Sequence, residues 1–186
     1  AVQPRTPDLA DLLHYCRHSA APVGRHVLAL HGESEATWPA SDSLCAALQI
    51  NNHLQDCAGD LAGMDRCYLP DAMLAKYGSD ISDLRRPTAT PALRAVLDAL
   101  LDECDRLIRE GATRLVSFGI AGALDPALKP GDIILASAVR LPDGHRQPAD
   151  QKWLVHIAQA LPHARIADVA GSSTIVATAA DKRTLH

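Results

Sequence analysis

The chain has 186 residues and a net charge of −4 at pH 7, with 47% hydrophobic and 22% charged residues. This composition is that of a globular protein of one or two domains, and its slight acidity gives no electrostatic reason to expect nucleic acid as a partner. No apolar run approaches the ~20 residues of a membrane-spanning helix. The five cysteines include no CxxC pair, which disfavours a zinc site or a disulfide framework and favours buried free thiols.

Residues 8–110 show helical periodicity. We expect a long helix from residue 42 to about 62, a loop through residues 68–70, and a short helix over residues 71–77 that stops at Gly78. The clearest helix covers residues 90–110, with Thr90 as N-cap, Pro91 in the first position and Gly111 as the stop. Its apolar stripe consists of Leu93, Val96, Leu97, Leu100, Leu101, Cys104, Leu107 and Ile108.

The period changes after Gly111. Residues 113–119 predict a buried strand, residues 120–131 a loop rich in Gly and Pro, and residues 132–140 further strand. A helix is expected over residues 150–161 and a strand over residues 165–170, and Thr178 with Asp181 resembles a capping box that opens a last helix. The pattern therefore predicts a mixed fold, with an all-α domain over residues 1–110 and an α/β segment over residues 111–186.

The most informative stretch places Asn52, Asp56 and Asp60 at steps of four, with Gln49 three residues before them. On a helix these side chains share one face and direct oxygen atoms into the same space. Two aspartates four residues apart repel each other, and no basic residue stands between Arg25 and Arg66 to compensate. A bound Mg²⁺ would compensate, because it prefers oxygen ligands and commonly bridges carboxylates to phosphates. The alternative is a solvated acidic face, since the DxxxD spacing alone is common.

Three motifs around this stretch resemble the squalene/phytoene synthase family. Residues 15–25 (YCRHSAAPVGR) resemble its YC…VG segment, residues 46–56 (AALQINNHLQD) resemble its ALQxxNxxxD motif, and residues 66–70 (RCYLP) resemble its RxY(L/F)P motif. The Pro22-Val23-Gly24 variant is most similar to the hopanoid-associated squalene synthase branch of bacteria.

The resemblance implies a partial isoprenoid-synthase-type helical bundle that acts as a Mg²⁺-dependent transferase on a prenyl diphosphate of the presqualene diphosphate type. It implies that Asn52, Asp56 and Asp60 bind Mg²⁺ and diphosphate, and that Asp56, Asp60 and Tyr15 are catalytic. It further assigns substrate binding to Gln49, Asn52, Arg66, Tyr68, Val23 and Gly24, the last two where a helix breaks to admit the prenyl chain. Tyr15 and Tyr68 have an alternative interpretation as half-buried core residues, and Arg66 one as a surface residue.

The family's first aspartate-rich motif, expected on an earlier helix, does not occur before Tyr15. The resemblance therefore implies an incomplete metal site, and whether the chain is an active enzyme stays open. The lipid substrate allows peripheral association with the inner face of a membrane in a cytoplasmic protein, and uncovered apolar faces allow a homo-oligomer.

Residues 115–126 (LVSFGIAGALDP) and 129–134 (KPGDII) resemble the purine nucleoside phosphorylase/nucleosidase superfamily, in its hopanoid-associated phosphorylase branch. The resemblance implies a nucleoside-binding turn at Gly119, Ile120, Ala121 and Gly122, whereas a strand–turn–strand without a ligand is the plain alternative. Because the two resemblances meet near residue 110, we also consider that the chain is a fusion of two partial proteins without catalytic activity.

Overall fold

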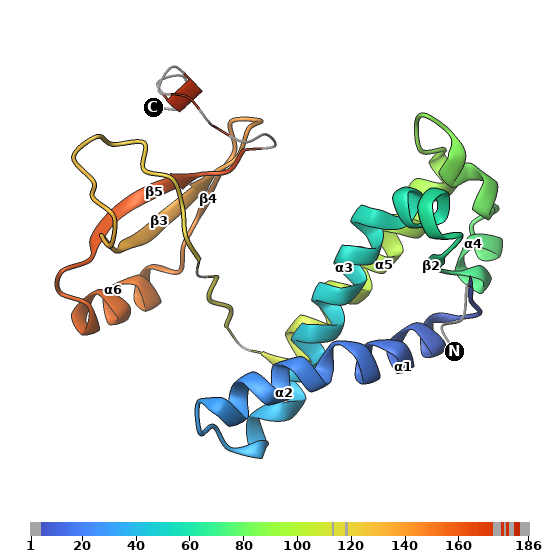
Figure 1. The fold of residues 1–186 in the computed structure, drawn as a ribbon, viewed down its shortest axis with the longest axis horizontal. Helices are drawn as coiled ribbons and strands as arrows, with labels where there is room; N and C mark the ends of the chain where they lie inside the picture. Colours follow the sequence, from blue (N-terminus) through green and yellow to red (C-terminus); the bar gives the residue numbers. More distant parts are fainter. Residues whose placement is uncertain are drawn as a thin grey trace. The chain divides into compact units, whose positions relative to one another are not determined.

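The computed structural model describes residues 5–112, 114–117, 119–172, 176, 178 and 181–182. The chain divides into two compact units, Ala1–Val116 and Ser117–His186, and each is described by itself (Figure 1). The sequence-based boundary at residues 110/111 lies six residues before this division.

Two helices that meet end to end open the first unit. Helix α1 covers Leu9–Ser19, and its N-cap Asp8 accepts a hydrogen bond from the backbone N–H of Asp11 at 3.0 Å. Ala20 ends α1 and immediately precedes α2 (Ala21–Leu30), which has a proline in its first turn. Because proline tolerates the first turn of a helix but not its interior, the chain restarts a helix here instead of continuing α1.

The two longest helices lie side by side in Figure 1 and form the frame of the first unit. After a short 3₁₀ helix η1 (Glu35–Thr37), α3 runs through Trp38–Met64, longer at both ends than expected. Helix α5 covers Pro91–Gly111, and its N-cap Thr90 accepts from the N–H of Leu93 at 3.1 Å, which confirms the predicted start. A Cβ on Gly111 would lie 2.8 Å from the Cβ of Ser43, so the two helices approach closely at this end.

A small parallel ribbon joins the start of the chain to the segment after α3. Strand β1 (Arg5–Thr6) pairs in parallel with β2 (Cys67–Pro70), so the prediction of a loop over residues 68–70 is wrong. Helix α4 (Asp71–Lys76) follows, then Gly78 at φ 71°, and then the 3₁₀ helix η2 (Ile81–Arg85). The positive φ at Gly78 confirms the predicted stop of the short helix.

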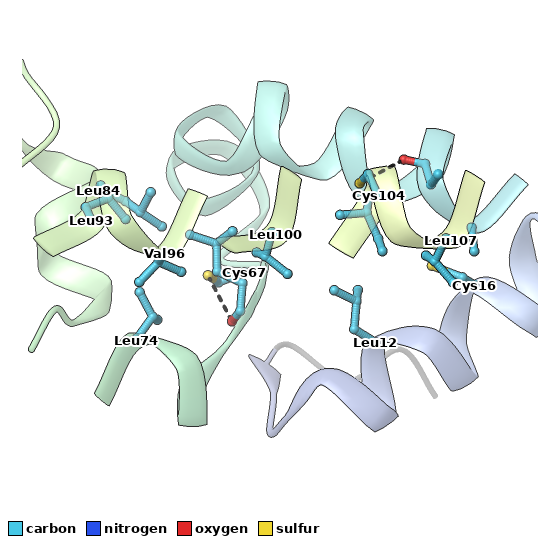
Figure 2. Close-up of a cluster of buried hydrophobic side chains, with 14 of the residues drawn as sticks. Leu12, Cys16, Cys67, Leu74, Leu84, Leu93, Val96, Leu100, Cys104 and Leu107 are labelled. Atoms are coloured by element: carbon cyan, nitrogen blue, oxygen red, sulfur yellow. Dashed lines mark hydrogen bonds between the residues drawn. The ribbon is translucent and has the colours of Figure 1, made fainter. Parts of the chain in front are cut away.

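The core of the first unit is built from the apolar stripe of α5. Figure 2 shows Leu12 and Cys16 of α1 and Leu74 of α4 facing the side chains of this stripe. Leu101 is 46% exposed, so its predicted place in the stripe is wrong: it lies past the edge of the face that the other helices cover. All five cysteines are free thiols, as predicted, and three of them are buried: Cys16, Cys67 and Cys104.

The second unit contains a three-stranded sheet and one helix. Strand β3 (Ile134–Arg140) lies between β4 (Arg146–Pro148), which is antiparallel to it, and β5 (Arg165–Ala170), which is parallel to it. Helix α6 (Gln151–Ala160) connects β4 to β5 and packs against β3, with Leu154 and Ala138 buried. These elements confirm the predicted strands over residues 132–140, from residue 134 on, and 165–170, and the predicted helix over residues 150–161.

The predicted strand over residues 113–119 is wrong for the residues described. Residues 114–117 and 119 have no regular structure, and Leu115 and Val116 are each 55% exposed. A strand needs a neighbour to satisfy its backbone groups, and the sheet of the second unit contains only β4, β3 and β5 among the described residues. The capping box is confirmed: Thr178 Oγ1 accepts from the N–H of Asp181 at 3.1 Å, and the Asp181 carboxylate accepts from the N–H of Thr178 at 3.1 Å.

Candidate functional site

The acidic face predicted from the sequence lies on the second half of α3. Asn52 and Asp56 are exposed and Asp60 is partly exposed, so all three side chains reach solvent. Within residues 5–112, neither Asp56 nor Asp60 has an ion-pair partner within 4.0 Å. The mutual repulsion of the two carboxylates is therefore not compensated by an ion pair with a basic side chain of residues 5–112.

Helix α2 covers the first half of the same face. A Cβ on Gly24 would lie 2.5 Å from Cys45 Sγ and 2.6 Å from Ser41 Oγ, so α2 meets α3 at these two residues. Cys45 precedes Asn52 by seven residues, which is two helical turns, and therefore lies on the same side of α3. The acidic residues thus begin where α2 ceases to cover this side.

Val23 and Gly24 lie in the first turn of α2, just after the helix break at Ala20. The predicted break is therefore present, although it falls three residues before Val23. Val23 is 63% exposed, whereas Gly24 is packed against α3. Only Val23 is thus available to contact an apolar chain.

Three rings from distant parts of the chain meet beside the acidic face. Tyr15 of α1 lies 5.2 Å from Tyr68 of β2, measured between ring centroids. His53 of α3 stacks on Tyr68 at 3.8 Å and 15°, and lies 5.7 Å from Tyr15. The two tyrosines predicted for the site are therefore brought together, with a histidine that the sequence analysis did not single out.

The turn that follows α3 places Arg66 and Tyr68 beside the acidic face. Asp65 caps the helix in the left-handed region at φ 52°, and the N–H of Arg66 donates to the carbonyl of Asp60 at 3.2 Å. Arg5 stabilises the turn by donating to the backbone carbonyl of Asp65 at 2.7 Å and to its carboxylate at 3.0 Å. The reversal brings a guanidinium and a phenol back along the last turns of α3.

The Tyr68 hydroxyl is electrostatically linked to its neighbours. Its pKa is raised, first by burial and then by its hydrogen bond to Tyr15, while Arg66 acts in the opposite direction. The phenol is therefore protonated at neutral pH and able to donate a hydrogen bond. Tyr15, Arg66 and Tyr68 are all partly exposed, so this polar group remains accessible from solvent.

Gln49 lies one turn before His53 and contacts its ring. The side-chain nitrogen of Gln49 is 3.1 Å from Nε2 of His53. Because an amide nitrogen only donates, Nε2 accepts and the imidazole carries its proton on Nδ1. Burial lowers the pKa of His53, and the nearby Asp60 and Asp56 oppose this effect only in part. The imidazole is therefore neutral at pH 7.

The donor set on α3 matches what Mg²⁺ takes from proteins when it also binds a phosphate. Within the described residues there is no cluster of three or more His, Cys, Asp and Glu side chains, so a site closed by protein ligands alone does not form. Two carboxylates and one amide oxygen on an open face would leave room for water and phosphate oxygens around a bound Mg²⁺, as this ion usually requires.

The residues predicted to bind a nucleoside lie in the second unit. Gly119, Ile120, Ala121 and Gly122 are all exposed, and a Cβ on either glycine would meet nothing within 4 Å. They do not follow a strand, since residues 114–117 and 119 form none. The structure therefore brings together the predicted residues of the first unit but forms no pocket wall from these four.

A comparison with protein families agrees with the geometry of the first unit. The family described as squalene/phytoene synthase matches residues 1–161. The chain belongs to this family. Nothing in the comparisons indicates a phosphorylase or nucleosidase.

Curated relatives from the family match more than half of the chain at high identity. The chain is 48% identical over 107 residues to a hydroxysqualene synthase of Rhodopseudomonas palustris, which covers 58% of this chain and 37% of the relative. It is 45% identical over 101 residues to a hydroxysqualene synthase of Sinorhizobium fredii, covering 54% and 35%. The chain thus spans little more than a third of the length of these relatives.

A solved structure shows the same helical fold. The squalene synthase HpnC of Alicyclobacillus acidocaldarius superposes with a TM-score of 0.55 at 38% identity, over 59% of this chain and 41% of that one. The predicted isoprenoid-synthase-type helical fold is thereby confirmed for the first unit. Among the described helices, none is both long and apolar enough to cross a membrane.

Proposed function

We propose that the first unit provides a Mg²⁺–diphosphate-binding face of a hydroxysqualene-type synthase acting on presqualene diphosphate. The observation that carries this proposal is the acidic face of α3, with Asp56 and Asp60 free of basic partners in residues 5–112 and with Arg66, Tyr15 and Tyr68 beside it. A solvated acidic face would have no reason to adjoin a guanidinium and two linked phenols. The names of the relatives support the choice of product.

Each residue of the face has a role in this proposal. Asn52, Asp56 and Asp60 would hold Mg²⁺, and the ion would supply positive charge to offset that of the diphosphate leaving group. Arg66 donates hydrogen bonds to diphosphate oxygens, for which the planar guanidinium is well suited. Gln49 lies one turn before Asn52 and extends the polar lining of the site.

The chemistry that follows is ionisation and capture. The C–O bond breaks with its electron pair leaving on the diphosphate, the resulting carbocation rearranges to the squalene skeleton, and water captures it and then loses a proton to give an alcohol. The faces of Tyr15 and Tyr68 stabilise positive charge through their π systems. These rings also exclude bulk water from one side of the cation, so that capture is limited to the water held in the site.

The apolar part of the substrate needs a surface as well. Val23, Val27 and Leu30 are exposed at 63%, 49% and 73% and lie at helical spacing on α2. This stripe supports contact with a prenyl chain. Peripheral association with the inner face of a membrane and a homo-oligomer belong to the same proposal, since each would cover such a stripe, and the proposed location is cytoplasmic.

Two alternatives remain predictions. A phosphorylase-like second unit is favoured by the parallel β3–α6–β5 arrangement, but its proposed turn at residues 119–122 is exposed and follows no strand. A non-catalytic fusion fragment would keep the helical fold without binding a ligand. Both alternatives predict that the acidic face of α3 has no affinity for Mg²⁺ with diphosphate.

Calorimetric titration with inorganic pyrophosphate, with and without Mg²⁺, tests the proposal. We expect Mg²⁺-dependent binding that is lost in the double variant Asp56→Ala/Asp60→Ala. A matched control is Asp98→Ala/Asp102→Ala, which removes an exposed pair of the same spacing on α5 that has no arginine–tyrosine group recorded beside it. No binding by the natural sequence, or equal loss in the control, would contradict the proposal.

A further inference from the structure

His53 is the one buried polar side chain of α3, at 8% exposure, among the described residues of that helix. It directly follows the exposed Asn52 and precedes the exposed Asp56 by three residues. A helix turns about 100° per residue, so His53 lies at the border between the acidic face and the core. A histidine at this border either only fills space in the core or holds a neighbouring side chain of the site in a fixed orientation.

The contact with Tyr68 favours the second role. A centroid distance of 3.8 Å at 15° is a parallel stack, in which the imidazole lies against one face of the phenol ring. Covering that face prevents the ring from turning toward α3. Since the Tyr68 hydroxyl interacts with both Tyr15 and Arg66, the ring's orientation decides where this polar group is placed.

The imidazole is itself held. The hydrogen bond from Gln49 at 3.1 Å fixes the rotation of the His53 ring, and Tyr15 lies beside the stacked pair, with its ring centroid 5.7 Å from that of His53 and 5.2 Å from that of Tyr68. The result is a continuous series of contacts from Gln49 through His53 to Tyr68, and from Tyr68 to Tyr15 and Arg66. The stacked ring thus links residues of α1, α3 and β2, of which Tyr15 and Tyr68 are more than fifty positions apart.

We infer that His53 is a positioning residue, which fixes the Tyr68 ring and thereby the Tyr15–Tyr68–Arg66 group beside Asp56 and Asp60. This inference rests on the proposed function for its consequence, but its structural content can be measured separately. His53 touches no reacting atom in this scheme. It acts only through the ring that it supports.

NMR of ring-labelled tyrosine tests the structural content directly. The chain has three tyrosines. The third, Tyr77, has the Lys76 ammonium over its ring and does not belong to this group, so its signals serve as an internal reference. The stacked imidazole shifts the Tyr68 ring signals by its ring current. We expect this shift to disappear in His53→Leu, which fills the space without a ring, and to remain in His53→Phe, which keeps the stack.

Pyrophosphate titration with Mg²⁺ then tests the consequence. We expect His53→Leu to weaken binding about tenfold, the lower end of what loss of a supporting partner costs a metal site, and His53→Phe to restore most of it. Should the Leu variant not fold, His53→Gln lacks a ring and keeps a polar group for Gln49, with the same expected loss. Thermal unfolding confirms that each variant is folded.

The outcomes separate the two proposals. An unchanged Tyr68 signal in folded His53→Leu would overturn the positioning role, because His53 would then be a passive core residue. A changed Tyr68 signal with unchanged pyrophosphate affinity would overturn its link to the site. If the natural sequence binds no Mg²⁺–pyrophosphate, the proposed function fails, whereas the NMR comparison still decides whether His53 fixes Tyr68.

Discussion

Gly24 of α2 lies so close to Cys45 of α3 that a Cβ atom on the glycine would come within 2.5 Å of the cysteine sulfur. A Cβ there would also lie 2.6 Å from Ser41 Oγ. The absence of a side chain therefore lets α2 rest directly on α3, at the boundary where the acidic face begins.

Replacement of this glycine should loosen the helix pair. We expect Gly24→Ala to lower the free energy of unfolding by about 1–3 kcal/mol, the usual cost of overpacking. Urea unfolding followed by circular dichroism at the helical signal measures the change. The loss of unfolding free energy will be near the lower end of this range if the Ser41 and Cys45 side chains can rotate away from the added methyl group.

Gly59 provides a matched control for Gly24. It lies inside α3, and a Cβ on it would meet nothing within 4 Å. Alanine is a better helix former than glycine, so Gly59→Ala should raise the free energy of unfolding by up to about 1 kcal/mol. Equal effects of the two substitutions would show that helix propensity, and not the contact with Cys45, governs the Gly24 position.

A second prediction concerns the start of α5. Thr90 Oγ1 accepts from the N–H of Leu93 at 3.1 Å and donates to the buried carboxylate of Asp83 at 3.3 Å. Thr90→Ala removes both bonds and should cost about 1–2 kcal/mol of unfolding free energy. Thr90→Ser keeps the hydroxyl and should cost much less in the same urea measurement. A similar loss for both would contradict the capping role.

Helix α5 was predictable because its signals are local. Thr90, Pro91 and the apolar stripe all act within the helix, and the structure keeps them in those roles. Gly111 ends the helix as expected, but for another reason. It does not have a positive φ, and a glycine is needed here because α5 approaches Ala40 and Ser43 too closely for a side chain. That approach joins residues almost seventy positions apart, which no local signal indicates.

The site was predictable in part for the same reason. The spacing of Asn52, Asp56 and Asp60 places them on one face of any helix. The stack of His53 on Tyr68 depends instead on the left-handed turn at Asp65 and on the pairing of β2 with β1, which begins at Arg5. The strand pairing is a tertiary contact, and the left-handed turn falls on an aspartate and not on a glycine that would indicate it, so His53 read from the sequence is only one more residue of an amphipathic helix.

A third prediction follows from the buried thiol of Cys16. Burial raises its pKa from 9.0 to about 11. The unfolded chain loses this proton first, so the contribution to stability is complete below pH 9 and lost as the pH rises toward 11. We expect the free energy of unfolding to fall by about 2–3 kcal/mol over this interval, at 1.36 kcal/mol for each pKa unit.

Urea titrations at several alkaline pH values measure this slope. Cys16→Ala is less stable throughout because it leaves a small void, but it should show a shallower decline between pH 9 and 11. The Cys16 thiol should also resist a soluble disulfide reagent until the chain unfolds, since it is fully buried. Rapid modification of the folded protein at this residue would disprove the assignment.

A fourth prediction concerns the second unit, where Asp168 ties three strands together. Its carboxylate, on β5, accepts from Ser137 Oγ of β3 at 2.6 Å and from Arg140 Nε of β3 at 2.9 Å. Arg146 of β4 donates to it twice, each time at 2.9 Å. Asp168→Asn should therefore reduce hydrogen-exchange protection in β3 and β5 without changing α3 or α5.

Asp143→Asn is the control for this substitution. Asp143 lies in the hairpin after β3 and accepts only from the nearby His145 among the contacts found for it. It touches no other strand, so the sheet should keep its protection. Equal loss in both variants would indicate a general effect of removing a negative charge and not the loss of the cross-strand contact.

The pH dependence of the same sheet gives an independent test. Hydrogen bonds from Arg146 and then Ser137 hold the pKa of Asp168 well below its ordinary value of 3.8. The contribution of a carboxyl with a depressed pKa is present above that ordinary value and is lost as the pH falls below it. Protection of β3 and β5 should therefore decline below about pH 4 in the natural sequence. In Asp168→Asn this decline in protection at acid pH should be absent, because the amide does not titrate. A decline that persists in the variant would show that another carboxyl causes it.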